Sequence, residues 1–161
     1  MKRRTLLASG AAALTGCVGG GSAVDADAPP RERLRQHVGA VVNSRSIGQS
    51  PAAEIEQTGD GFEIIASYEV NSSLGADGTK DLTDEVAYDV AKRVYQDAAD
   101  VSSFGIVGLV PVVDEYGGES EEELTLVEIE DSTAERIVWE NTNYTDVEDF
   151  ADRYYFRDRY F

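Results

Sequence analysis

A chain of 161 residues is long enough for one folded domain. With a single cysteine it cannot form an intramolecular disulfide, so its fold must be stabilised by a hydrophobic core. Acidic residues outnumber basic ones by 31 to 14, which gives a net charge of −17 and argues against a nucleic-acid partner, because a phosphate backbone requires a basic face. Disorder is the alternative for so charged a chain, but 42% hydrophobic residues and clear periodic segments favour a folded domain.

The first 22 residues have the layout of an export signal. Lys2, Arg3 and Arg4 precede an apolar run, which small residues and Cys17 follow. The run is too short to span a membrane, since a spanning helix needs about 20 apolar residues. An arginine pair followed by leucines is typical of twin-arginine (Tat) signals, which carry folded proteins across a membrane.

The residues around the single cysteine match a lipobox, the site at which a lipoprotein is cut and lipidated. They are Leu14, Thr15, Gly16 and Cys17. Together with the arginine pair and the acidic composition, the segment resembles the signals of haloarchaeal Tat-exported lipoproteins. The resemblance implies that residues 1–16 are removed and that Cys17 carries the lipid that holds the protein on the extracellular face of the cell membrane. The alternative is a cleaved signal in which the cysteine is incidental.

The expected mature chain consists of a tether and one domain. Residues 17–30, with a glycine run near their start, form the lipidated linker, and residues 31–161 form a single globular domain. Loss of the three N-terminal cations leaves 11 basic residues against 31 acidic ones. Self-repulsion would destabilise such a domain in dilute buffer, whereas molar salt shortens the Debye length to about 3 Å. The composition therefore predicts a protein adapted to high salt.

Hydrophobic periodicity predicts the elements of the first half of the domain. Apolar residues spaced for one helix face predict a helix over residues 31–42, and strict alternation predicts a strand over residues 62–70. Residues 52–57 are a weaker strand candidate, joined to it by a glycine-containing hairpin loop. Residues 71–80 are predicted to be a loop. Residues 81–100 are predicted to be the longest helix, with Thr83 as its N-cap.

The second half begins with a nearly continuous apolar run over residues 104–113, which predicts a well-covered strand. Its Pro111 requires an edge or a bulge. An acidic turn leads to a strand over residues 123–130, whose alternation changes phase and suggests a bulge. Capping boxes that begin at Ser132 and Thr145 predict two short helices. The order α-ββ-α-ββ-α-α indicates an α+β domain with a small antiparallel sheet of about four strands and helices packed on one face.

The sequence contains no recognisable catalytic set. His37 is the only histidine, and no nucleophile motif accompanies it, which favours a structural histidine over a general base. One histidine and one cysteine argue against a zinc site or an iron–sulfur cluster, so we expect no metal and no cofactor. We therefore predict a non-enzymatic binding or interaction module. A small cell-surface hydrolase that uses acidic residues is the alternative.

Aromatic side chains gather towards the C-terminus, interleaved with arginines. One interpretation is that they cap the core. The other is a surface that binds a surface or membrane protein, because Tyr, Trp and Arg are favoured at interfaces. The candidate interaction residues are Trp139, Tyr144, Tyr154, Tyr155 and Arg157.

Overall fold

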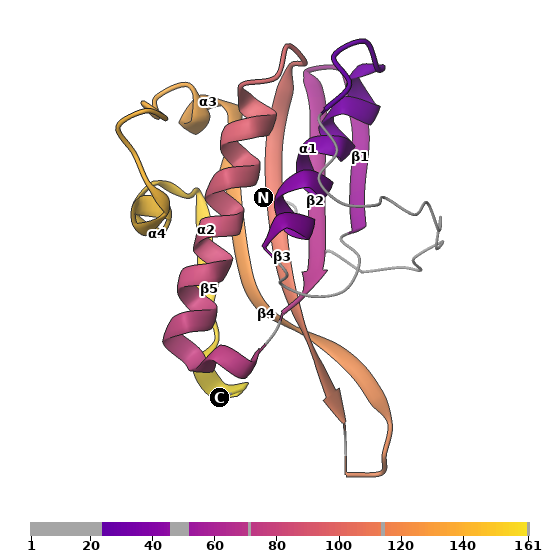
Figure 1. Ribbon diagram of the computed structural model, residues 1–161, viewed down its shortest axis with the longest axis vertical. Helices are drawn as coiled ribbons and strands as arrows, with labels where there is room; N and C mark the ends of the chain where they lie inside the picture. The colour runs from indigo at the N-terminus through magenta and orange to yellow at the C-terminus, as the bar shows by residue number, and fades with distance from the viewer. Residues whose placement is uncertain (1–23, 46–51, 71, 114, 161) are drawn as a thin grey trace.

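The computed structural model describes residues 24–45, 52–70, 72–113 and 115–160 (Figure 1). The signal and lipobox residues, 3–17, lie outside the described residues. The elements are α1 (Pro30–Ser44), β1 (Ala52–Thr58), β2 (Gly61–Glu69), α2 (Gly75–Tyr95), β3 (Val101–Val113), β4 (Glu119–Glu130), α3 (Asp131–Ala134), α4 (Val147–Phe150) and β5 (Arg153–Phe156), with short 3₁₀ helices at Ser72–Leu74, Tyr144–Asp146 and Asp158–Tyr160.

The five strands form one sheet in the order β1-β2-β3-β4-β5. All neighbours pair antiparallel except β2 and β3, which are parallel. The α+β class is confirmed, whereas the sheet is mixed rather than antiparallel and has five strands rather than about four. The parallel pair arises because α2 returns the chain to the end of the sheet at which β2 began, so β3 runs in the same direction as β2.

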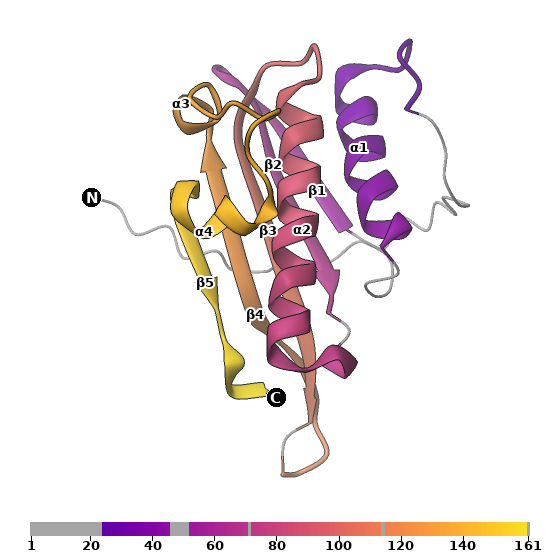
Figure 2. The same ribbon diagram turned by 60° about the vertical axis from the view of Figure 1, so that its left-hand side comes forward.

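Helices α1 and α2 lie side by side across one face of the sheet (Figures 1 and 2). The predicted stripe on α1 is confirmed, and its apolar side chains are buried against the sheet and α2: Leu34, Val38, Val41 and Val42. Pro30 occupies the first helical turn, where a missing N–H costs nothing.

Helix α2 begins at Gly75, inside the segment predicted to be a loop, and ends at Tyr95 rather than near residue 100. Thr83 is therefore not an N-cap. Its side chain is buried within the helix, and its hydroxyl donates to the carbonyl oxygen of Lys80 at 2.7 Å. The first turn of α2 is largely exposed, and its burial begins at Thr79, which is 1% exposed. The glycines of this segment have poor helix propensity, which is why the sequence predicted a loop there.

The core lies between the two helices and the sheet, and its largest side chains come from the central strands. Ile64, Phe104 and Ile106 are each at most 1% exposed. Gly108 lies among them because a Cβ there would approach Val70 Cγ2 to 2.7 Å and Thr125 Cγ2 to 2.8 Å. A larger residue would separate β3 from its neighbours.

The expected bulge in β4 is present, and it explains the change of phase in that strand. Gly108 pairs with Thr125 while Leu109 pairs with Glu123, so Leu124 is the extra residue. Beyond Leu109, β3 pairs only with β4, and the two strands form an arm that projects past the helices (Figure 1). Pro111 lies in this arm, where no other strand requires its missing N–H.

The C-terminal segment differs most from its predicted form. Helices α3 and α4 span four residues each, and neither predicted capping box forms. Asn143 is the N-cap instead: its side chain accepts from Thr145 N at 2.9 Å, and Asp146 accepts from Asn143 N at 3.1 Å. Tyr154, Tyr155 and Phe156 form the edge strand β5, an element that the sequence did not predict.

Candidate interaction surface

One face of the sheet is covered by helices, and no described helix covers the other, which we call the open face (Figure 2). Strand pairing and the alternation of burial define the side chains on it: Glu54, Glu56, Glu63, Ile65, Ser67, Glu69, Gly105, Val107, Leu109, Glu123, Leu126, Glu128, Arg153 and Tyr155. At Gly105, a Cβ would meet only the carbonyl oxygens of Ile64 and Val127, both at 3.9 Å, so space is open above the centre of this face.

The centre of the open face is apolar. Ser67, Val107, Leu126 and Tyr155 share one row across four neighbouring strands. Ile65 and Leu109 flank this row on either side; Ile65 is 37% exposed. Val107, Leu109 and Tyr155 are half-buried, and Leu126 is 6% exposed. Apolar side chains that form a contiguous patch, rather than lying singly, mark candidate contact surfaces.

Carboxylates border this patch on the side of β1 and β2. They are Glu54, Glu56, Glu63 and Glu69, and none of the four forms an ion pair with a residue in the described part of the chain. Glu56 and Glu63 are direct cross-strand partners. Like charges placed directly opposite each other destabilise a sheet, so this arrangement lowers the stability of the isolated domain.

The β4–β5 side of the open face is electrostatically satisfied. Arg153 pairs with Glu128 at 2.8 Å, and the guanidinium of Arg157 lies 4.9 Å from the ring centroid of Tyr155. The Tyr155 hydroxyl donates to Glu123. Burial, together with that hydrogen bond to a carboxylate, raises the pKa of Tyr155 to about 12, so the hydroxyl remains a donor at neutral pH.

The structure separates the five residues predicted to form an interaction surface. Only Tyr155 and Arg157 lie on the open side of β5. Trp139 is 8% exposed and belongs to the core, where its ring contacts Tyr88, Tyr95 and Phe150 at centroid distances of 5.8, 6.3 and 6.2 Å.

The other two of the five also lie against the core. Tyr144 packs against it from the 3₁₀ helix before α4. Tyr154 points to the helix side, because successive residues of a strand face opposite ways.

The apolar residues of the open face were not among the predicted candidates. In the alternating pattern of β2, Ile65 is an apolar residue at a position where the pattern otherwise places polar residues. This departure from the pattern was visible in the sequence and pointed to an apolar group on the open face. Val107 and Leu109 belong to the apolar run that we interpreted as a well-covered strand. Their exposure depends on where the helices pack, which the run itself does not record.

Asp84 is the one aspartate in the described part of the chain that is buried as a whole residue, at 4% exposure. It accepts from Lys80 Nζ at 2.8 Å and from the Tyr154 hydroxyl at 2.9 and 3.2 Å. Burial raises the pKa of Asp84, and the two hydrogen bonds oppose that rise. The contacts join α2 to β5, so the arrangement is a structural link between a helix and an edge strand.

His37 is also part of a structural link. Its Nε2 lies 3.0 Å from Asp97 Oδ2, and Arg33 donates to both oxygens of the same carboxylate at 2.7 and 3.1 Å. Asp97 further accepts from the backbone N–H of Ala99 at 2.9 Å. The carboxylate is therefore fully engaged in holding α1 against the turn that follows α2.

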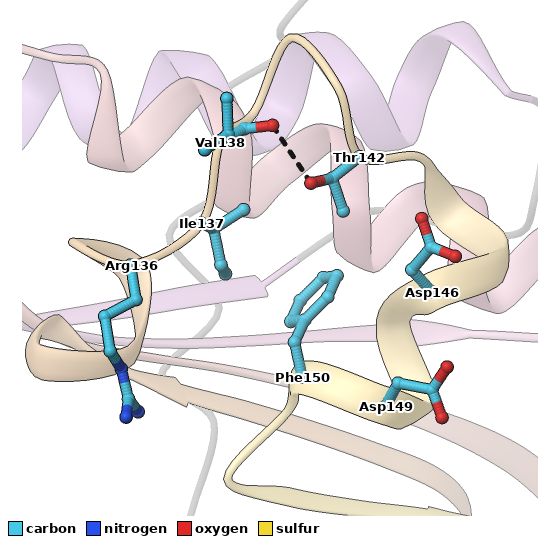
Figure 3. A pocket seen from close by; sticks show the side chains of 7 residues that line it. All are labelled: Arg136, Ile137, Val138, Thr142, Asp146, Asp149 and Phe150. Carbon is cyan, nitrogen blue, oxygen red and sulfur yellow. Dashed lines mark hydrogen bonds between the residues drawn. The ribbon is translucent and has the colours of Figure 1, made fainter.

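A shallow pocket of about 420 Å³ lies between the C-terminal segments (Figure 3). The Phe150 ring lies at its centre below Ile137, with Arg136 at one end and Asp146 and Asp149 at the other. Thr142 closes one wall by donating its hydroxyl to the carbonyl oxygen of Val138 at 3.0 Å. The pocket has polar groups of both signs at its ends and an apolar floor.

Among the described residues, no helix combines the length and the apolar character that crossing a membrane requires. Within the same residues, no three side chains of His, Cys, Asp or Glu are grouped as metal ligands. Comparison with models of known protein families, with curated protein sequences and with solved structures finds no match to this chain.

Proposed function

We propose that this protein is a lipid-anchored, non-enzymatic interaction module on the extracellular face of the cell membrane. It binds a surface or membrane protein through the open face of its sheet. The observation that carries the binding role is the one-sided layering of the domain. Helices α1 and α2 cover one face of the sheet, and no described helix lies over the apolar row centred on Val107 on the other face. A module of this kind needs neither a metal nor a cofactor.

The anchor is supported by the sequence of the first 22 residues. The arginine pair directs export, and two acyl chains on Cys17 hold a protein at a membrane stably, whereas one chain binds only marginally. The second half of the predicted linker folds against the domain: Asp25 N donates to Gln36 at 2.8 Å, and Arg33 donates to the carbonyl oxygen of Ala28 at 3.0 Å. A flexible tether over the remaining residues 17–23 would have a root-mean-square length of about 15 Å. The domain would therefore stay within reach of other proteins in the same membrane.

Substitution of the anchor residue tests this placement. Cys17→Ser should abolish lipidation and either release the protein into the medium or leave the signal uncut, as seen by fractionation and intact mass. Ser22→Ala, in the tether, is the matched control and should be processed like the original chain. Unchanged cleavage and membrane association of Cys17→Ser would refute the anchor.

Site-specific photo-crosslinking in the native host tests the binding face. A crosslinking amino acid at Ser67, in the central row of the open face, should join the protein to one discrete surface or membrane protein. The same group at Asp81, exposed on α2, is the control and should not give that product. No adduct from Ser67, or the same adducts from both positions, would contradict the proposal.

The high-salt environment has its own test. The carboxylates of the domain repel one another, and that repulsion is screened in molar salt. Helix and strand signal in circular dichroism should therefore be lost on dialysis from molar salt into dilute buffer. Full retention of the signal would refute salt adaptation.

A further inference from the structure

We infer that the surface which docks on the open face is a basic, amphipathic protein segment: a strip of Arg or Lys side chains beside an aliphatic ridge. This inference rests on the proposed function, since it describes the partner of that same face. Charge is divided unequally between the β1–β2 half and the β4–β5 half of the open face.

The β1–β2 half of the open face carries negative charge that no ion pair with another described residue neutralises. Glu56 and Glu63 are direct cross-strand partners, Glu54 is two residues from Glu56 on the same face, and Glu69 lies further along β2. An arginine or lysine of a partner placed between Glu56 and Glu63 would replace a repulsion with two ion pairs. The free domain is therefore under an electrostatic penalty that a cationic partner removes.

The other half of the open face requires no cation. Glu128 is paired with Arg153, and Glu123 accepts from the Tyr155 hydroxyl. Between the halves lie Val107 and Leu109, which can only gain by contact with apolar groups. The complementary surface is thus basic over β1 and β2 and aliphatic over β3, rather than uniformly basic.

This division of charge disfavours two other occupants. A second copy of the chain would bring Arg153 and Arg157, and both already contact groups within their own copy, at Glu128 and Tyr155. An anionic lipid surface would be repelled by the carboxylates of the β1–β2 half.

Two synthetic peptides of equal length test the inference on the full chain purified in detergent. In both peptides every second residue is Val or Leu. The residues between them are Arg in one peptide and Glu in the other. The Arg peptide should bind with the open face as its footprint, seen as shifts in the amide resonances of Ile65, Val107 and Tyr155. The Glu peptide should not bind.

A pair of double variants separates the open face from net charge. Glu56→Gln with Glu63→Gln should weaken binding of the Arg peptide about fivefold. Asp77→Asn with Asp81→Asn removes the same charge from exposed positions on α2 and should change affinity less than twofold. The first double variant should also unfold at a temperature no lower than the original chain, because a repulsion has been removed.

Equal losses in the two double variants, or equal binding of the two peptides, would overturn the inference. So would a crosslink from Ser67 to a second copy of this chain. If Ser67 crosslinks to another protein through a segment without Arg or Lys, the inference fails while the proposed function stands. If Ser67 yields no adduct in cells, the proposed function itself fails.

Discussion

The contact between Asp97 and α1 allows a stability prediction worked from the structure. Asp97 follows α2, its side chain is 7% exposed, and it accepts hydrogen bonds from Arg33 and His37 on α1. Asp97→Asn keeps the size of the side chain and removes its charge. The amide can accept through only one of its two terminal atoms, so the two-pronged contact with Arg33 is also lost.

The magnitude follows from the pKa of Asp97, which the hydrogen bond from Arg33 lowers from the ordinary 3.8 to about 2. A shift of nearly two units corresponds to about 2.5 kcal/mol in favour of the folded, charged form at neutral pH. Because the folded-state pKa is the lower one, this contribution is present above about pH 4 and is lost as pH falls through about 2. At pH 3 about half of it remains.

Urea unfolding followed by circular dichroism, in molar salt at pH 7 and pH 3, measures the effect. Asp97→Asn should lower the free energy of unfolding by about 2 kcal/mol at pH 7 and by about half as much at pH 3. Asp89→Asn is the control: it also breaks an ion pair between α1 and α2, with Arg45, but that pair is about one-third exposed and should cost less than about 1 kcal/mol. The same loss for Asp97→Asn at both pH values, or a loss no larger than that of the control, would refute the electrostatic account.

The same structure predicts the effects of three further substitutions. Asp84→Asn should lower the free energy of unfolding at pH 7 by less than Asp97→Asn does in the same assay. Burial raises the pKa of Asp84, so above about pH 3.8 folding works against its charged form, and removal of that charge costs less stability. An equal loss in the two variants would contradict this. Gly108→Ala should lower the free energy of unfolding by about 1–3 kcal/mol, because its Cβ would lie 2.7–2.8 Å from two buried side chains. Gly105→Ala, on the open face with 3.9 Å of clearance, should change it by less than about 1 kcal/mol, and equal effects at the two glycines would show that the space around them has been misjudged.

The arrangement of residues along the chain was enough to predict the elements that carry a long periodic pattern. The stripe from Leu34 to Val42 predicted α1, and the alternation around Ile64 predicted β2, because hydrophobic spacing over two or more turns or several alternations is a local property. The bulge in β4 was also visible locally, as a change of phase near Leu124. The export signal and Cys17 are sequence features in the same sense, and their roles stay predictions.

Only the tertiary structure decided the direction of β3, the start of α2 and the existence of β5. The parallel pairing of β2 and β3 depends on where α2 returns the chain, and no residue of either strand encodes it. The four residues of β5 are too few to distinguish a strand from a helix by period, so their hydrogen bonds to β4 settle the matter.

The candidate site shows the same division. The cluster of aromatic and basic residues near the C-terminus predicted an interaction surface, and two of its five candidates, Tyr155 and Arg157, lie on the open side of the sheet. Pairing with β4 turned Tyr154 towards Asp84, and packing enclosed Trp139 in the core. Which side chains a partner can reach depends on the face that the helices cover, and that is a property of the assembled layers rather than of any segment.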